Sequence, residues 1–173
     1  LTPEKAVEIQ SNIGADIMMC LDICPPAKAD REAVLPTLDL THDWARRCRS
    51  AWADDGRQAL FGIVQGALFE DLRKQSAECL AEMNFPGYAI GGVAVGEDTP
   101  EIRRIVDYTA PLLPADKPRY LMGDGTPADI IASVEAGVDM FDCVMPTRHA
   151  RHFQAFTRYG TLNLKNARFA EDD

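Results

Sequence analysis

The stretch Met140-Phe141-Asp142-Cys143-Val144-Met145-Pro146-Thr147-Arg148 carries the signals from which the fold prediction starts. Residues 137–141 are mostly apolar, which is typical of a short buried strand, and Asp142 follows at its carboxyl end. Pro146 predicts that regular structure stops there. A lone aspartate after a strand more often caps a loop than does chemistry, so Asp142 by itself predicts no site.

The charge of the chain is segregated. Its 173 residues have a formal net charge of −9, which taken alone argues against a nucleic-acid partner. Residues 145–168, however, contain five Lys or Arg, two of the three histidines and no Asp or Glu. This basic strip contributes +5 and leaves −14 for the rest of the chain. A carboxylate beside such a strip suggests chemistry on a polyanion.

Composition places the chain among cytoplasmic globular proteins. Its hydrophobic residues make up 46%, yet no apolar run approaches the roughly 18 residues of a membrane span. Residues 1–5 lack the pattern of a signal peptide. The five cysteines are odd in number and scattered, which argues against a disulfide framework. No second Cys or His pair accompanies Cys20 and Cys24 at zinc spacing, so we predict no metal site in this chain.

Predicted strands and helices alternate along the chain. We expect strands at 15–21, 59–64, 88–90, 119–122 and 137–141. Helices are expected at 3–13, 38–53, 69–83, 99–113 and from 126 onward, with a loop up to Leu35. In the helix at 38–53, the predicted packing face contains Leu40, Trp44, Cys48 and Trp52. Residues 154–164 are typical of a β-hairpin.

This alternation indicates an α/β fold with a parallel sheet. A doubly wound sheet and part of a (β/α)8 barrel both fit. Polar or glycine residues follow all five strands, and barrel sites gather residues from many strand ends, whereas an open sheet concentrates them at one point. We therefore predict a (β/α)8 TIM barrel, incomplete here because a full barrel needs about 250 residues. About five β/α units would occupy residues 1–144. The basic strip and its hairpin would occupy residues 145–173.

The strand-end residues also suggest chemistry. Asp22 and Asp142 could divide labour, one attacking a cationic centre and the other binding a donor-rich ligand edge. Gln65 offers a donor and an acceptor, which suits a nucleobase, and Gly91-Gly92 would let a ligand approach backbone N–H groups. Loop capping or a buried amide explains the same residues equally well. No lysine stands at a strand end, which argues against a Schiff-base aldolase barrel.

Six ordered segments resemble the queuine tRNA-ribosyltransferase family, also called tRNA-guanine transglycosylase. They are Leu1-Thr-Pro-Glu, Gly14-Ala-Asp-Ile-Met-Met with Asp22-Ile-Cys-Pro-Pro, Phe61-Gly-Ile-Val-Gln-Gly, residues 85–97, Pro118-Arg-Tyr-Leu-Met-Gly and residues 140–148. The resemblance implies a glycosyltransferase of queuosine biosynthesis. Such an enzyme exchanges guanine at the wobble position of the tRNA anticodon loop for a 7-deazaguanine, through a covalent ribosyl-aspartate.

The resemblance also implies roles for individual residues. Asp142 would be the nucleophile, Asp22 would accept hydrogen bonds from the base, and Gln65 and the Gly92 N–H would address its exocyclic oxygen. The base pocket would further contain Cys24, Val93, Tyr120, Met122 and Gly123, while Arg148 and Arg151 would contact tRNA. Cys24 and Val95 match the bacterial type, which takes 7-aminomethyl-7-deazaguanine. Glu97 would hold the peptide of Val93.

Several family features are missing. The N-terminal third, whose Asp-Ser-Gly-Gly-Phe-Gln carries the general acid/base, and the C-terminal zinc ligands are absent from this sequence. Ile23, Asp124 and His152-Phe153 also depart from the family pattern. We therefore expect zinc and a homodimer in the full-length enzyme, little activity from this chain alone, and self-association through exposed strand edges. The alternative is a non-catalytic tRNA-binding partner subunit, which would be expected to have lost Asp22, Gln65 or Asp142.

Overall fold

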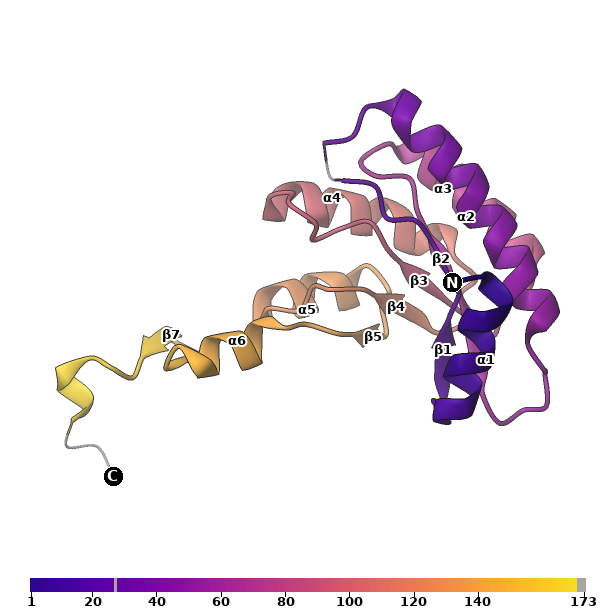
Figure 1. The fold of residues 1–173 in the computed structure, drawn as a ribbon. Coiled ribbons are helices and arrows are strands. Elements are labelled where there is room, and N and C mark those ends of the chain that lie inside the picture. The colour runs from indigo at the N-terminus through magenta and orange to yellow at the C-terminus, as the bar shows by residue number, and fades with distance from the viewer. Residues whose placement is uncertain (27, 171–173) are drawn as a thin grey trace.

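A curled, five-stranded parallel sheet forms the body of the protein. The computed structural model describes residues 1–26 and 28–170. Its strands pair in chain order, as β1-β2-β3-β4-β5, and every pair is parallel. A doubly wound sheet would reverse this order at a switch point. The order confirms the predicted half-barrel (Figure 1), with strands β1 (Ile17–Met19), β2 (Ala59–Val64), β3 (Gly87–Ile90), β4 (Arg119–Leu121) and β5 (Met140–Phe141).

The helices between the strands mostly follow the predicted boundaries. They are α1 (Pro3–Ile13), α2 (Arg31–Ala51), α3 (Glu70–Glu82), α4 (Thr99–Thr109) with the 3-10 turn η1 (Ala110–Leu112), and α5 (Pro127–Glu135). Local signals fix the ends of α1: the Thr2 side chain accepts the N–H of Lys5, and Gly14 ends the helix with a left-handed φ of +80°. Within the described residues, no helix is long and apolar enough to span a membrane.

Helix α2 differs from its prediction in two ways. It begins at Arg31, so the predicted loop up to Leu35 is wrong, and Pro36 lies inside its early turns. The apolar Val34 and Leu38 become fully buried through this extension, which offsets the hydrogen bond that the proline cannot donate. The predicted packing face is confirmed at Cys48 and Trp52, which are buried, but it is wrong at Leu40, which is exposed, and Trp44 is only half-buried. The face that packs contains Val34, Leu38, Thr41, Ala45 and Cys48.

The C-terminal residues form an arm that projects from the sheet (Figure 1). Pro146 does not stop regular structure. Helix α6 (Met145–Arg151) starts there, since a proline fits the first turn, where its N–H would have no partner anyway. Strands β6 (Gln154–Thr157) and β7 (Gly160–Asn163) pair in antiparallel register and confirm the hairpin. The short turn η2 (Ala167–Phe169) follows.

Close contact between β2 and β3 depends on a glycine. A Cβ atom added at Gly87 would overlap the ring of Phe61, its partner in the strand register. We expect Gly87→Ala to lower the free energy of unfolding by about 2 kcal/mol, because the ring has to leave its packed position. Urea unfolding measures this change. In a Phe61→Leu background the same substitution should cost clearly less, and an equal cost in both backgrounds would contradict the clash.

Candidate active site

A cavity of about 300 Å³ opens at the carboxyl end of the sheet. It contains every predicted base-pocket residue except Tyr120, and Asp142 as well. Its volume lies at the lower end of the range for small-molecule sites, which is roughly 300–1,000 Å³. The lining residues are Asp22, Cys24, Gln65, Gly91, Gly92, Val93, Ala94, Val95, Met122, Gly123 and Asp142.

The topology explains why these residues meet. Asp22 follows β1, Gln65 follows β2 directly, Gly91 follows β3, Gly123 follows β4, and Asp142 follows β5. Because all five strands are parallel and adjacent in chain order, their carboxyl ends share one edge of the sheet. Residues spread over 120 positions of sequence thus line a single cavity.

Asp22 and Gln65 form a hydrogen-bonded pair in the cavity wall. The Gln65 Nε2 donates to Asp22 Oδ2 at 2.7 Å, and Gln65 is 2% exposed. Burial raises the pKa of Asp22, while the hydrogen bond from Gln65 opposes that shift. Among the described residues, Gln65 Oε1 is buried without a hydrogen-bond partner. Nε2 has a second hydrogen besides the one that Asp22 accepts, so the amide can still donate to a ligand.

Gly91 and Gly92 leave room for the Gln65 side chain. A Cβ atom at Gly91 would lie 2.7 Å from Gln65 Nε2, and one at Gly92 would overlap Gln65 Oε1. The φ of Gly92 is +64°, a conformation that favours glycine. The two glycines thus leave space for the Gln65 side-chain amide, in addition to letting a ligand approach their backbone N–H groups.

Asp142 is exposed at the mouth of the cavity and is held by one backbone contact. Its Oδ1 accepts the N–H of Gly123 at 3.0 Å. Tyr120 lies close by, although it does not line the cavity: partial burial and then the negative charge of Asp142 raise its pKa. Asp142 thus caps a loop and is exposed at the same time, since its Oδ1 accepts a backbone N–H while the residue faces the solvent.

Polar side chains behind the cavity support Gln65 from α2 and α3. The Gln65 N–H donates to Ser76 Oγ at 3.2 Å, and this hydroxyl lies 3.0 Å from His42 Nε2. Burial, followed by the charge of Arg46, lowers the pKa of His42. The neutral imidazole can then accept a hydrogen bond from the Ser76 hydroxyl group. Sequence reasoning missed these residues, because nothing local to His42 or Ser76 shows that they meet.

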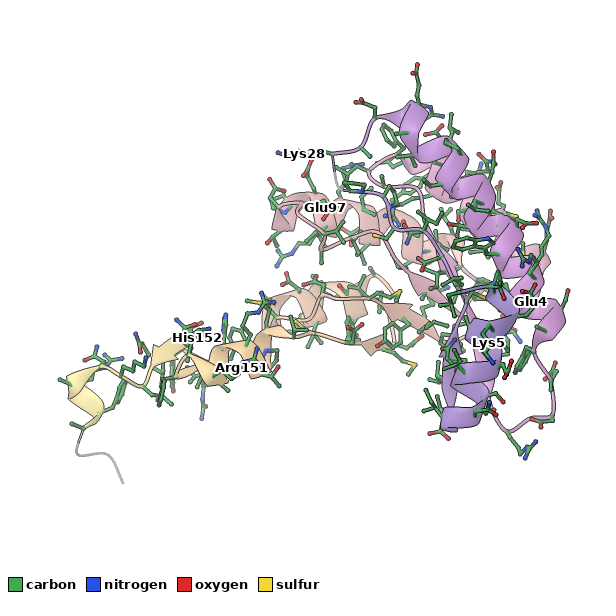
Figure 2. The ribbon with its side chains drawn as sticks, in the orientation of Figure 1. Glu4, Lys5, Lys28, Glu97, Arg151 and His152 are labelled. Atoms are coloured by element: carbon green, nitrogen blue, oxygen red, sulfur yellow. The ribbon has the colours of Figure 1, made fainter. Side chains whose placement is uncertain are left out.

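Three further predictions concern residues around the cavity. Glu97 accepts the N–H of Val95 at 2.8 Å, so its predicted contact with the Val93 peptide is not the one that forms. Arg148 and Arg151 are exposed on α6 and do not line the cavity. Figure 2 shows Arg151 on the projecting arm and Glu97 on the body of the protein.

The cysteines are all free thiols, as predicted, and two of them, Cys20 and Cys48, are buried. The described residues hold no group of three or more His, Cys, Asp or Glu side chains placed to bind a metal ion. The residues that line the cavity offer two carboxylates, an amide, the Cys24 thiol and backbone N–H groups to a ligand.

Two comparisons with known proteins identify the family of the chain. A family model described as Queuine tRNA-ribosyltransferase matches residues 1–173. Among curated proteins with that name, the chain is 56% identical to one from Solidesulfovibrio magneticus over 173 residues. It is 53% identical over 172 residues to those from Lysinibacillus sphaericus and Bacillus subtilis. The alignments cover 99% of this chain but 45–46% of each relative, so it spans about half their length. The chain belongs to the queuine tRNA-ribosyltransferase family.

Proposed function

We propose that this chain is the nucleophile- and base-binding part of a bacterial-type tRNA-guanine transglycosylase. The observation that carries the proposal is the convergence of Asp142 with the Asp22–Gln65 pair on one cavity. A free carboxylate lies next to a hydrogen-bonding wall that suits the edge of a flat base. The reaction is the exchange of guanine at the wobble position of tRNA for 7-aminomethyl-7-deazaguanine, a step of queuosine biosynthesis in the cytoplasm.

Asp142 is the nucleophile in this proposal. Its carboxylate attacks C1′ of the ribose, the glycosidic bond breaks, and the bonding electron pair leaves with guanine. The incoming 7-deazaguanine then attacks C1′ of this ribosyl ester through its ring nitrogen, whose proton passes to the general acid/base of the full-length enzyme. The C1′–O bond breaks, its electron pair returns to the Asp142 carboxylate, and two inversions give net retention, as in a retaining glycosidase. The contact from the Gly123 N–H keeps one carboxylate oxygen in place, so that the other is directed toward the sugar.

The remaining lining residues bind the base. Asp22 accepts hydrogen bonds from its N–H groups, and Gln65 and the Gly92 N–H contact the exocyclic oxygen. Tyr120 and Met122 sandwich the flat ring. The pocket is closed by Cys24, Val93, Val95 and Gly123, of which all but Cys24 follow β3 or β4.

Other parts of the reaction involve tRNA and chain segments outside this sequence. Arg148 and Arg151, exposed on α6 within the basic strip, contact phosphates or loop bases of tRNA. The general acid/base, a zinc site and the homodimer interface belong to the remainder of the full-length enzyme. A non-catalytic tRNA-binding subunit is disfavoured, because Asp22, Gln65 and Asp142 are all retained and line one cavity.

Incorporation of labelled guanine into unmodified tRNA tests the proposal. We expect exchange by the full-length protein that contains this chain, with the Bacillus subtilis relative as positive control. The 173-residue chain alone should be at least about 100-fold slower, because general acid/base catalysis contributes on the order of 10²–10⁴-fold. No incorporation by the full-length protein would refute the function, whereas ready incorporation by the chain alone would refute the missing acid/base.

A further inference from the structure

Among the described residues, Arg73 on α3 is the largest fully buried side chain, and the hydrogen bonds of its guanidinium go to backbone carbonyls. Its Nε donates to the Ala67 carbonyl at 2.6 Å. Nη1 and Nη2 both donate to the Gly91 carbonyl, at 3.0 and 3.1 Å, and Nη2 also donates to Gly92 at 3.0 Å. One guanidinium thus connects the loop after β2 to the loop after β3, both of which border the cavity.

Backbone carbonyls surround the buried charge of Arg73. Arg73 takes part in none of the ion pairs found among the described residues. Burial lowers its pKa to about 10, so the group still carries its charge at neutral pH. Burying a charge without a salt-bridge partner costs free energy, which the four hydrogen bonds to backbone carbonyls offset in part. This cost points to a role in function.

Gly66 makes the arrangement possible. A Cβ atom at Gly66 would lie 2.8 Å from the Arg73 backbone nitrogen and 2.9 Å from its Cγ, and the φ of Gly66 is +142°. Ala67, whose carbonyl accepts from Nε, has a left-handed φ of +49°. The backbone thus takes a strained course that brings its carbonyl oxygens to the guanidinium.

The contacts of Arg73 determine where two N–H groups point. The Gly91 carbonyl and the Gly92 N–H belong to one planar trans peptide, so they point in opposite directions. The same holds for the Gly92 carbonyl and the Val93 N–H. Since both carbonyls converge on one guanidinium, both N–H groups face away from it, and both residues line the cavity. Neither amide donates to a backbone carbonyl among the described residues. The Gly92 backbone does contact the Cys24 thiol, and this contact opposes the rise in the pKa of Cys24 that burial causes. Successive N–H groups of this kind form an anion-binding nest.

We propose that Arg73 is a positioning residue that makes the Gly92 and Val93 amides charge-assisted donors toward the exocyclic oxygen of the departing purine. A carbonyl that accepts from a cation polarises its own peptide, which strengthens the N–H at the other end. When the glycosidic bond breaks, its electron pair moves onto the purine, and part of that charge reaches the exocyclic oxygen. The donors are therefore stronger partners in the transition state than in the ground state. This inference rests on the proposed function.

Comparing the binding of two free bases, guanine and 2-aminopurine, distinguishes this role of Arg73 from simple support of the pocket. Guanine carries the exocyclic oxygen, and 2-aminopurine lacks it. In the full-length protein, Arg73→Lys keeps the charge but not the planar fork that holds three carbonyls. We expect the affinity for guanine to fall about 10-fold and that for 2-aminopurine less than 2-fold. Binding of 2-aminopurine is followed by its fluorescence, and guanine by competition. Formation of the covalent tRNA adduct should slow by more than the loss of guanine affinity.

Arg104→Lys is the matched control. Arg104 is an exposed arginine on α4 that also contacts a carbonyl, that of Leu68, and pairs with Glu70. This variant should behave like the unaltered protein with both bases. Arg73→Met serves as a second variant if thermal denaturation shows that it folds, and should enlarge the difference between the bases. An equal loss for guanine and 2-aminopurine, or no loss for either, would overturn the role of Arg73. Failure of the unaltered protein to bind guanine would instead overturn the proposed function, and this inference with it.

Discussion

Replacing Asp142 with asparagine in the full-length protein is expected to lower guanine exchange by at least about 10⁴-fold and to abolish the covalent adduct with tRNA. An amide cannot attack C1′ as a carboxylate does. The asparagine oxygen can still accept the Gly123 N–H that holds Asp142 at 3.0 Å, so the loop geometry is retained. Because Asp142 is exposed, the substitution should leave stability almost unchanged.

Asp107→Asn is a matched control for this prediction, since Asp107 is an exposed aspartate on α4, away from the cavity. It should exchange guanine at the unaltered rate. The measurement is a denaturing gel after incubation with tRNA, in which a ribosyl ester migrates as a protein–RNA adduct. An adduct that persists in Asp142→Asn would show that another residue attacks the sugar.

The order of elements could be predicted because its signals are local. Thr2 and Gly14 delimit α1 within a few residues, and the apolar run at 59–64 coincides with β2. The errors at α2 and α6 came from prolines. Pro146 lies in the first turn of α6, where its N–H would have no helical partner anyway. Pro36 lies in the second turn of α2, where the burial of Val34 and Leu38 offsets the hydrogen bond that it cannot donate.

The candidate site was predictable to the extent that topology alone determines it. Residues that follow parallel strands must meet at one edge, so Asp22, Gln65 and Asp142 could be grouped before any coordinates. Arg73 could not be assigned to this group from the sequence, because its hydrogen-bond partners belong to loops and a charged side chain is usually found at the surface. Its spacing gave one signal: together with Ala77 and Leu80, it lies on the buried stripe of α3.

Asp22→Asn is expected to change base binding and stability in opposite directions. We expect the affinity for guanine to fall about 100-fold, because a hydrogen bond to a charged acceptor contributes roughly 1.5–3 kcal/mol. Stability of the ligand-free protein should rise at neutral pH. Burial is the main influence on Asp22 and raises its pKa above the value in the unfolded chain. The stability that Asp22 contributes is therefore fully present below the unfolded pKa and is lost as pH rises through the folded one.

An asparagine stays neutral at every pH, so its stability advantage should be absent in acid and grow as the carboxyl group of the unaltered protein ionises. It still offers an oxygen to Gln65 Nε2, which keeps the 2.7 Å contact of the cavity wall. Thermal denaturation at a series of pH values measures the effect. Asp16→Asn is the control, because Asp16 is an exposed aspartate at the opposite end of β1 and should show no such trend. A melting temperature below that of the unaltered protein at neutral pH would mean that ionised Asp22 stabilises the fold. The burial of Asp22 in the cavity would then not lower the stability of the ligand-free protein.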